Sequence, residues 1–261
     1  MHMASHEWNV SPKEAIEIQK QVRSEVRIEA FKKSAGKNLK DIEYIAGCDV
    51  SLNLYSTTIY AGFVVLTYPD LHLVDHSVVR DETHFPYVPG LLSFREIPAL
   101  TKAWEKLKTK PDLIVVDGQG IAHPRRLGIG SHLGVVLDMP TVGCAKSVLF
   151  GRYEEPKEVG DSSPLIDPKT GETIGTILKS KARSKPLVIS AGHKISQKES
   201  LDIIRACLRG YRLPEPTRLA HNIMNEYRKK ANESNAIMLA DMKDDGSAHG
   251  VRDGREADSR G

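Results

Sequence analysis

Two aspartates stand in apolar segments, where a carboxylate is costly unless a cation or a hydrogen-bond donor compensates it. Asp49 lies within the strand-like run 45–50, and alternation along a strand places it on the face opposite its two neighbours. Asp117 directly follows the apolar run 112–116, at the carboxyl end of a strand, where α/β sheets usually bind ligands. Both are candidate metal ligands, although an edge-strand aspartate in a turn would also explain Asp49.

Glu96 is the third candidate metal ligand. It follows Arg95 in a helix-like segment, and a glutamate beside an arginine on a helix is more often part of a solvated ion pair. Three carboxylates without nearby cysteine thiolates would suit Mg²⁺ or Mn²⁺, which prefer oxygen ligands, and not zinc. Glu96 is therefore a candidate metal ligand only in combination with Asp49 and Asp117.

The glycine-rich segment 117–128 is the most unusual in the chain. Its glycines permit close approach of the backbone to a ligand, and His123, Arg125 and Arg126 offer donors suited to phosphate. The segment lacks the Gly-Lys-Ser/Thr ending of a Walker A loop. A glycine-rich loop beside a solvated basic patch is the alternative interpretation. Lys146, just after a strand, is likewise either a phosphate contact or an exposed lysine.

Three other side chains are candidates for binding. Tyr87, between Pro86 and the pair 88–89, lies in a stiff loop that could hold an aromatic ring outward. Rigid aromatic or apolar wedges unstack bases, although a tyrosine in a turn more often covers the core. His193 and His221 are isolated histidines, which are more often structural hydrogen-bonding residues than functional ones.

The elements that must position these residues follow from hydrophobic periodicity and turn signals. The predicted order is a helix at 11–33, strands at 43–51, 57–68 and 71–80, a helix at 90–108, a strand at 112–116, a helix at 127–137, a strand at 140–144, a hairpin at 164–178, a strand at 185–190, and helices at 197–208 and 215–230. Among several folds, this order matches an α/β ribonuclease H-like fold, a mixed sheet flanked by helices. We expect a single domain.

Length and composition favour one soluble domain. The chain has 261 residues, of which 40% are hydrophobic, and no run of about 18 apolar residues predicts a membrane span. Residues 1–8 lack the basic-then-apolar order of a signal peptide, so we expect a cytoplasmic protein. Cys48, Cys144 and Cys207 are odd in number and far apart, which favours buried reduced thiols over disulfides or zinc ligands.

Charge and C-terminal composition add two expectations. The net charge is +3, and the last 21 residues have an acidic excess, so the remainder is the more basic part. This is consistent with a nucleic-acid partner but is weak evidence for one. We divide the chain into a flexible N-terminus at 1–8, a catalytic domain at 9–232, and a polar C-terminal tail, expected to be disordered, at 233–261.

Five motifs occur in order between about residue 9 and residue 228. They are Ala46-Gly47-Cys48-Asp49-Val50, PYVPGLLSFRE from Pro86 to Glu96, the segment from Asp117-Gly118-Gln119-Gly120 to Leu127-Gly128, Gly192-His193-Lys194-Ile195-Ser196, and LPEPTR from Leu213 to Arg218. Together they resemble the endonuclease V family. Five motifs in the right order are a specific signal.

The resemblance implies a ribonuclease H-like fold and metal-dependent hydrolysis of DNA at the second phosphodiester 3′ to a deaminated purine such as hypoxanthine. It implies Mg²⁺ as the cofactor, with Mn²⁺ as a substitute. The matching positions are metal carboxylates at Asp49, Glu96 and Asp117, further catalytic residues at Lys146, His123 and His221, a strand-separating wedge at Pro86, Tyr87 and Pro89, and a base pocket at Gly90, Gly118, Gly143 and Leu149.

Three rival interpretations stay open. Some members of the family prefer RNA, so a ribonuclease acting on inosine in single strands is the alternative enzyme. A binding module that retains deaminated sites without cutting is disfavoured, because a pure binder needs no clustered carboxylates beside a polyanion. A purely structural domain of this fold is the third. The expected partner is DNA with deaminated bases, with RNA as the alternative, for a monomer that binds no membrane.

Overall fold

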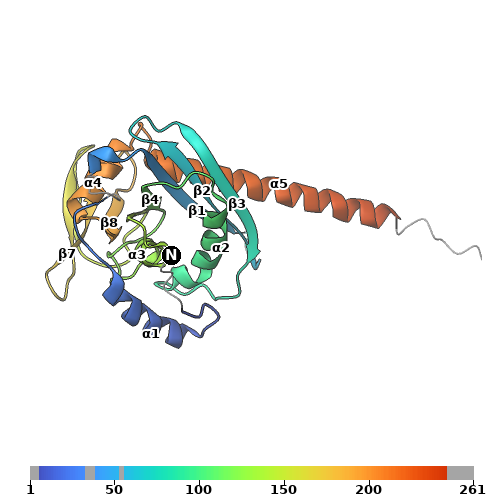
Figure 1. Cartoon of the computed structure of the whole chain (residues 1–261), viewed down its shortest axis with the longest axis horizontal. Helices are drawn as coiled ribbons and strands as arrows, with labels where there is room; N and C mark the ends of the chain where they lie inside the picture. Colours follow the sequence, from blue (N-terminus) through green and yellow to red (C-terminus); the bar gives the residue numbers. More distant parts are fainter. Residues whose placement is uncertain (1–5, 33–38, 53–55, 246–261) are drawn as a thin grey trace, which may run out of the picture.

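One mixed sheet of eight strands runs through the molecule (Figure 1). The computed structural model describes residues 6–32, 39–52 and 56–245, with 234–245 described by backbone alone. The strands are β1 (Tyr44–Leu52), β2 (Thr58–Thr67), β3 (Leu73–Glu82), β4 (Leu113–Val116), β5 (Thr141–Ala145), β6 (Ser162–Ile166), β7 (Thr173–Leu178) and β8 (Leu187–His193). Their order across the sheet is β3-β2-β1-β4-β5-β8-β7-β6. The predicted α/β ribonuclease H-like mixed sheet is confirmed.

Helices cover both faces of this sheet. They are α1 (Pro12–Val22), the 3₁₀ turns η1 (Arg23–Glu25) and η3 (Leu39–Asp41), α2 (Leu92–Lys106), α3 (Ile129–Leu137), α4 (Gln197–Ala206) and α5 (Glu215–Asp245). α2 and α3 pack on one face, and α4 and the first turns of α5 on the other. No helix in the described ranges combines the length and the apolar character needed to cross a membrane.

Alternation along β1 divides the core between the two faces. Ala46 and Cys48 point into the apolar cluster under α2 and α3, whereas Ile45 points into the cluster under α4 and α5. The pattern of a fully buried central strand is seen in β4, where all four residues are buried. Cys48, Cys144 and Cys207 are free and buried, as predicted.

The first helix is shorter than predicted. It was expected to span 11–33, but α1 ends at Val22 and the chain is extended from Val26 onward. The backbone at Arg27 is bound elsewhere: its carbonyl accepts from the Lys194 N–H, and its N–H donates to His193 Nδ1. Hydrogen bonds to β8 and the turn after it therefore replace those that would have continued the helix.

Both ends of the chain also differ from expectation. Residues 6–8 were assigned to a flexible N-terminus, yet Trp8 stacks on His132 and meets Phe94 edge-on. The last helix was expected to end near residue 230 and the tail to begin at 233, yet α5 continues to Asp245. Its sequence contains no glycine and has proline only in its first turn, so nothing in it breaks the helix before Gly246. Residues 1–5 and 246–261 lie outside the described residues.

Candidate active site

The parallel pairing of β1 and β4 places Asp49 and Asp117 side by side. Cys48 and Val116 are register partners in this pair, and each aspartate is the next residue along its own segment. Asp49 therefore lies within β1, and Asp117 directly follows the carboxyl end of β4, as the sequence predicted. The two residues are 68 positions apart in the chain and are brought together by strand register.

His221 of α5 joins the two aspartates. The ligand atoms of Asp49, Asp117 and His221 all lie within 4.8 Å of one another. His221 Nδ1 lies 2.9 Å from Asp49 Oδ2, and Asn225 Nδ2 lies 2.9 Å from His221 Nε2. Because an amide nitrogen only donates, Nε2 accepts, and the ring proton on Nδ1 is donated to Asp49. This hydrogen bond raises the pKa of His221 above its usual value, against the effect of burial.

Glu96 approaches the pair of aspartates from α2. It is buried, and burial, followed by the charges of Asp49 and Asp117, raises the pKa of Glu96 well above its usual value. Its own neighbour Arg95 donates to the carbonyl of Phe85, so the solvated Glu–Arg pair considered from the sequence is not formed. Glu96 is not among the three groups within 4.8 Å, and its role as a direct metal ligand stays a prediction.

Lys146 supplies the positive charge next to this cluster. Its Nζ donates to Asp117 Oδ2. Burial lowers the pKa of Lys146, but the charge of Asp117, this hydrogen bond and the charge of Asp49 together raise it above its usual value. Burial raises the pKa of Asp117, with Lys146 offsetting part of the rise. Arg212 Nη2 donates to the carbonyl of Lys146 at 2.7 Å and so fixes the backbone that carries this lysine.

These residues fit a divalent cation that prefers oxygen ligands. Asp49, Glu96 and Asp117 crowd three carboxylates into a buried corner, and a single lysine ammonium pairs with one of them. Burial, and after it the charge of neighbouring carboxylates, raises the pKa values of Glu96 and Asp117. No cysteine thiolate takes part, because the nearest thiol, Cys48, is buried on the opposite face of β1 with its pKa raised. The donor set suits Mg²⁺ or Mn²⁺ better than zinc.

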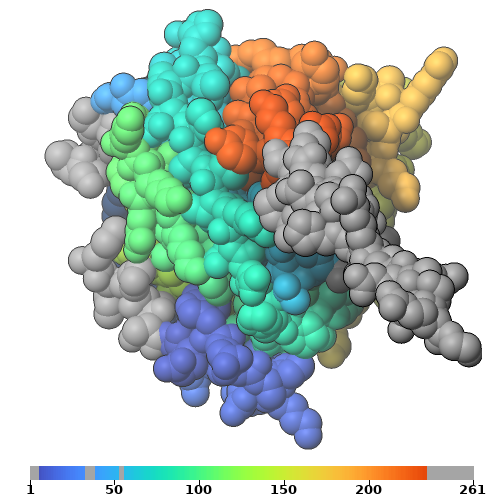
Figure 2. Space-filling view, turned by 90° about the vertical axis from the view of Figure 1, so that its right-hand side faces the viewer, coloured from blue at the N-terminus to red at the C-terminus, as the bar shows by residue number. Residues whose placement is uncertain are grey.

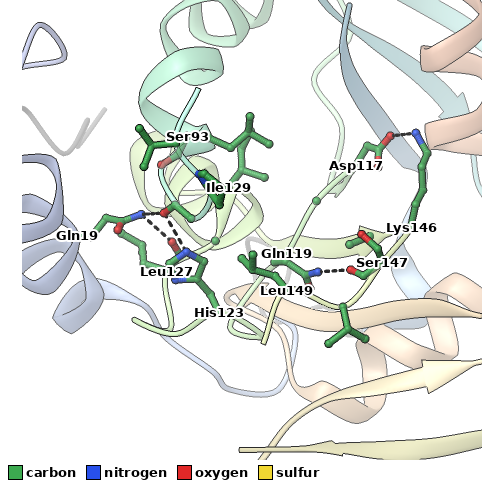
Figure 3. A pocket seen from close by; sticks show the side chains of 18 of the residues that line it. Gln19, Ser93, Asp117, Gln119, His123, Leu127, Ile129, Lys146, Ser147 and Leu149 are labelled. Atoms are coloured by element: carbon green, nitrogen blue, oxygen red, sulfur yellow. Dashed lines mark hydrogen bonds and ion pairs between the residues drawn. The ribbon is translucent and has the colours of Figure 1, made fainter. Parts of the chain in front are cut away.

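A cavity of about 300 Å³ opens beside the cluster (Figure 3). Asp117 and Lys146 form part of its wall, so the cavity and the cluster are continuous. Of the predicted binding residues, the structure brings Tyr87, Pro89, Gly90, Gly118 and Leu149 to this wall, together with His123. Pro86 and Gly143 are not part of the lining. Such a volume lies at the lower end of the range for small-ligand pockets and suits one nucleobase.

Gly143 acts from behind the cavity wall. A Cβ at Gly143 would lie 2.2 Å from the backbone nitrogen of Gly120 and 2.7 Å from the carbonyl oxygen of Gly118. Only glycine therefore allows β5 to approach the glycine-rich segment this closely. The sequence placed Gly143 in the pocket lining, and the structure instead places it as the support under that lining.

The basic residues of the glycine-rich segment have partners within the protein. His123 Nε2 donates to the Gly90 carbonyl at 3.0 Å, and His123 Nδ1 accepts from the Arg125 N–H. Burial lowers the pKa of His123 to about 4, so the ring is neutral near pH 7. Arg126 forms ion pairs with Asp167 and Glu172. These contacts lie within the protein, and the predicted phosphate contact by His123 stays a prediction.

Sequence reasoning missed two residues that the structure places at the site. Gln19 of α1 is buried and lines the cavity, and Asn225 of α5 orients His221. Gln19 could have been noticed, because it stands three residues from both Ile16 and Val22 on the apolar stripe of its helix. Asn225 gives no comparable signal, since a polar residue one turn after a histidine is common on any exposed helix.

Comparison with known proteins identifies one family model and several relatives that carry the same name. The family model described as Endonuclease V matches residues 20–222. Endonuclease V of Nostoc punctiforme is 48% identical over 219 residues, which cover 84% of this chain and 96% of the relative. Endonuclease V of Gloeobacter violaceus is 44% identical over 87% of this chain and 90% of its own.

Solved structures are similar over the same extent. The crystal structure of Endonuclease V from Streptomyces avermitilis has a TM-score of 0.77 and 34% identity, covering 86% of this chain and 96% of its own. Endonuclease V of Ciona intestinalis, solved in complex with a 24mer DNA containing an inosine followed by a ribo-adenosine, has a TM-score of 0.74 and 27% identity, covering 84% and 98%.

Proposed function

The chain belongs to the endonuclease V family and is an endodeoxyribonuclease, and on that premise we propose that it hydrolyses DNA at the second phosphodiester 3′ to a deaminated purine such as hypoxanthine. The observation that carries the proposal is the continuity of two sites. The cavity that can take one base shares Asp117 and Lys146 with the buried carboxylate cluster. A base held in the cavity leaves the phosphates beside it within reach of that cluster.

The cluster supplies what phosphodiester hydrolysis needs. Asp49 and Asp117, with Glu96 as a further carboxylate, would hold Mg²⁺, or Mn²⁺ in its place, beside His221. When bound, such an ion supplies Lewis-acid activation of the attacking water and of the phosphate oxygens. Lys146 lies where its ammonium can stabilise negative charge on the transferring phosphate.

The histidine at the edge of the cluster is oriented for a role in this chemistry. Asn225 donates to Nε2 of His221, and Ser51 and Arg228 donate to the oxygen of Asn225, so the amide is fixed in one orientation. His221 therefore keeps its proton on Nδ1, facing Asp49. This hydrogen bond orients the carboxylate of Asp49, which would hold the cation.

Attack by water on phosphorus with the 3′ oxygen leaving gives a 3′-hydroxyl and a 5′-phosphate, and the damaged base stays attached to its sugar. The test incubates labelled inosine-containing duplex DNA, single-stranded DNA and RNA with the protein, in Mg²⁺ and in EDTA, and analyses the products by mass spectrometry. A 5′ fragment that retains hypoxanthine plus one further nucleotide supports the proposal. Free hypoxanthine or a 3′-phosphate end contradicts the mechanism.

The RNA arm separates the two enzyme interpretations. The Ciona intestinalis protein was solved on DNA with a ribo-adenosine after the inosine, which makes a ribonucleotide at that position worth testing here. Cleavage of inosine-containing single-stranded RNA at a higher kcat/KM than the matched DNA would replace the proposal with the ribonuclease. The proposal further holds that the enzyme is a cytoplasmic monomer, a compartment consistent with three free buried thiols.

A further inference from the structure

Three side chains donate to a single carbonyl at the wall of the base cavity. The Gly90 oxygen accepts from Gln19 Nε2 at 2.9 Å, from His123 Nε2 at 3.0 Å and from Arg125 Nη2 at 3.0 Å. A fourth contact closes the network, because Arg125 Nε donates to Gln19 Oε1 at 2.5 Å. We call Gln19, His123 and Arg125 the Gly90 clamp. Figure 3 shows Gln19 and His123 near one another at the left of the view, with dashed lines marking their hydrogen bonds.

The clamp joins segments that are far apart in the sequence. Gln19 comes from α1, Gly90 ends the loop 86–90, and the other two residues come from the glycine-rich segment. Gln19 Nε2 also lies 3.3 Å from the carbonyl of Leu127 in that segment. In Figure 2, α1 in dark blue lies at the lower edge of the body, against the blue-green segment that leads into α2. A carbonyl oxygen has two lone pairs, so three donors saturate it.

The saturated carbonyl fixes the loop that carries Tyr87. Gly90 has a φ of 81°, which a side chain disfavours, and a Cβ there would lie 3.1 Å from Arg125 and 3.2 Å from His123. Tyr87, three residues earlier, is 74% exposed and lines the mouth of the cavity. The clamp therefore fixes one end of the loop while its aromatic side chain projects into solvent.

We propose that Gln19 is a positioning residue that, through the carbonyl of Gly90, holds the loop 86–90 against the cavity and thereby sets the preference for a modified base in a duplex. The inference rests on the proposed function. Opening a stacked pair needs a wedge held at a fixed distance from the pocket that receives the base. A single strand needs no such opening, so its cleavage depends less on the clamp.

The test compares Gln19→Glu and Gln19→Met with the unmodified protein. The glutamate keeps the volume and the contact with Arg125 but cannot donate to Gly90, and the methionine keeps only the volume. For inosine-containing duplex we expect KM to rise about tenfold, the effect of one lost buried hydrogen bond, with kcat unchanged. An inosine-containing single strand uses the same cavity but needs no opening of a pair, so there we expect a smaller rise in KM, of about threefold or less.

Ser11→Ala is the matched control. Ser11 caps the same helix, accepting from the Glu14 N–H, and does not contact the Gly90 clamp. It weakens α1 without altering the hydrogen bonds to Gly90. If Ser11→Ala raises the duplex KM as much as Gln19→Glu does, Gln19 acts only by stabilising α1, and the proposal is overturned.

Amide hydrogen exchange gives a second readout that needs no substrate. The Leu91 N–H donates to the Val88 carbonyl at 2.9 Å, and we expect its exchange to accelerate about tenfold in Gln19→Glu and not in Ser11→Ala. Unchanged exchange at Leu91 overturns the clamp. If the unmodified protein does not cut inosine-containing DNA, the proposed function fails while exchange still tests the clamp. Should Gln19→Glu not fold, Arg125→Ala removes two clamp contacts from a part-exposed side chain and takes its place.

Discussion

The two ends of the base cavity are built in opposite ways. At one end, Asp49, Glu96 and Asp117 crowd their charges, and burial raises the pKa of the last two. At the other end, the Gly90 clamp has its side-chain donors and acceptors paired within the protein, and His123 is a neutral ring. At the first end buried carboxylates of like charge lie close together, whereas at the second end the polar side chains are hydrogen-bonded within the protein.

This difference separates two tasks. A site that must bind a cation is best left with uncompensated negative charge, at a cost to the stability of the metal-free fold. A pocket that must admit one shape of base is best made rigid before the base arrives. The carboxylate cluster and the Gly90 clamp therefore should respond in opposite ways to substitution and to pH.

The largest expected effect comes from removing a carboxylate. Asp117→Ala should lower the cleavage rate on the order of a thousandfold or more, as loss of a charged group at a hydrolytic site commonly does, while binding of inosine-containing DNA changes little. A nicking assay beside a gel shift measures both. Asp202→Ala, which removes a carboxylate paired with Lys198 on the surface, is the control. Full activity of Asp117→Ala in Mg²⁺ would rule out the assignment of the metal site.

Glu96→Gln should separate stability from activity. We expect cleavage to fall about a hundredfold, while the metal-free protein at pH 8 becomes more stable by about 1 kcal/mol or more, because a buried charge without adequate compensation is removed. Urea unfolding in EDTA and a nicking assay in Mg²⁺ give the two numbers. A less stable Glu96→Gln protein would show that the charge of Glu96 does not destabilise the metal-free protein. The proposed contrast between the two ends of the cavity would then be wrong.

Tyr87→Ala tests the opposite end. Loss of an exposed stacking ring should reduce discrimination between inosine-containing and normal duplex about tenfold, with little change for single strands. The comparison uses kcat/KM on matched duplex and single-stranded substrates. The control is Tyr211→Ala, which replaces a half-exposed tyrosine that does not line the cavity. Equal losses on both substrates would mean that Tyr87 only covers the core.

The smallest expected effect is on the pH dependence of stability. The folded-state pKa values of Glu96 and Asp117 are raised, so the folded state holds protons that the unfolded chain has lost, and stability falls as pH rises above about 4. The pKa of His123 is lowered to about 4, so its contribution is instead lost as pH falls from about 6.5 to 4.

Unfolding in urea from pH 5 to pH 9, with EDTA or with Mg²⁺, measures this dependence. The alkaline loss of stability should be about 1 kcal/mol, should be smaller in Glu96→Gln, and should be reversed by Mg²⁺. The acid loss, to which the lowered pKa values of His123, His132 and His193 all contribute, should be the same in both proteins. An alkaline loss that Mg²⁺ leaves unchanged would mean that the cluster does not bind the ion in this way.

The sequence was most informative at residues whose type is unusual for the segment that contains them. The unusual carboxylates in two apolar segments indicated Asp49 and Asp117, and, as expected, Asp49 lies within β1 and Asp117 at the carboxyl end of β4. Glycines in the segment 117–128 predicted close approach of the backbone to a ligand, which stays a prediction, and the structure shows close approach of Gly120 to Gly143 within the protein. The roles of His123, Arg125 and Arg126 were not predictable in the same way, because a basic residue in a loop fits a solvated patch, an internal ion pair and a phosphate equally well.

By itself the sequence determined most element types, the two strand aspartates and the family. Hydrophobic periodicity and the order of motifs can be read from the sequence without knowledge of the fold. Only the tertiary structure decided which partners those residues have. The register of β1 with β4 joins Asp49 to Asp117, and the packing of α1 brings Gln19 to Gly90 across 71 positions. Such contacts depend on the free energy of the whole packed molecule, in which burial decides whether a side chain is paired, neutral or charged.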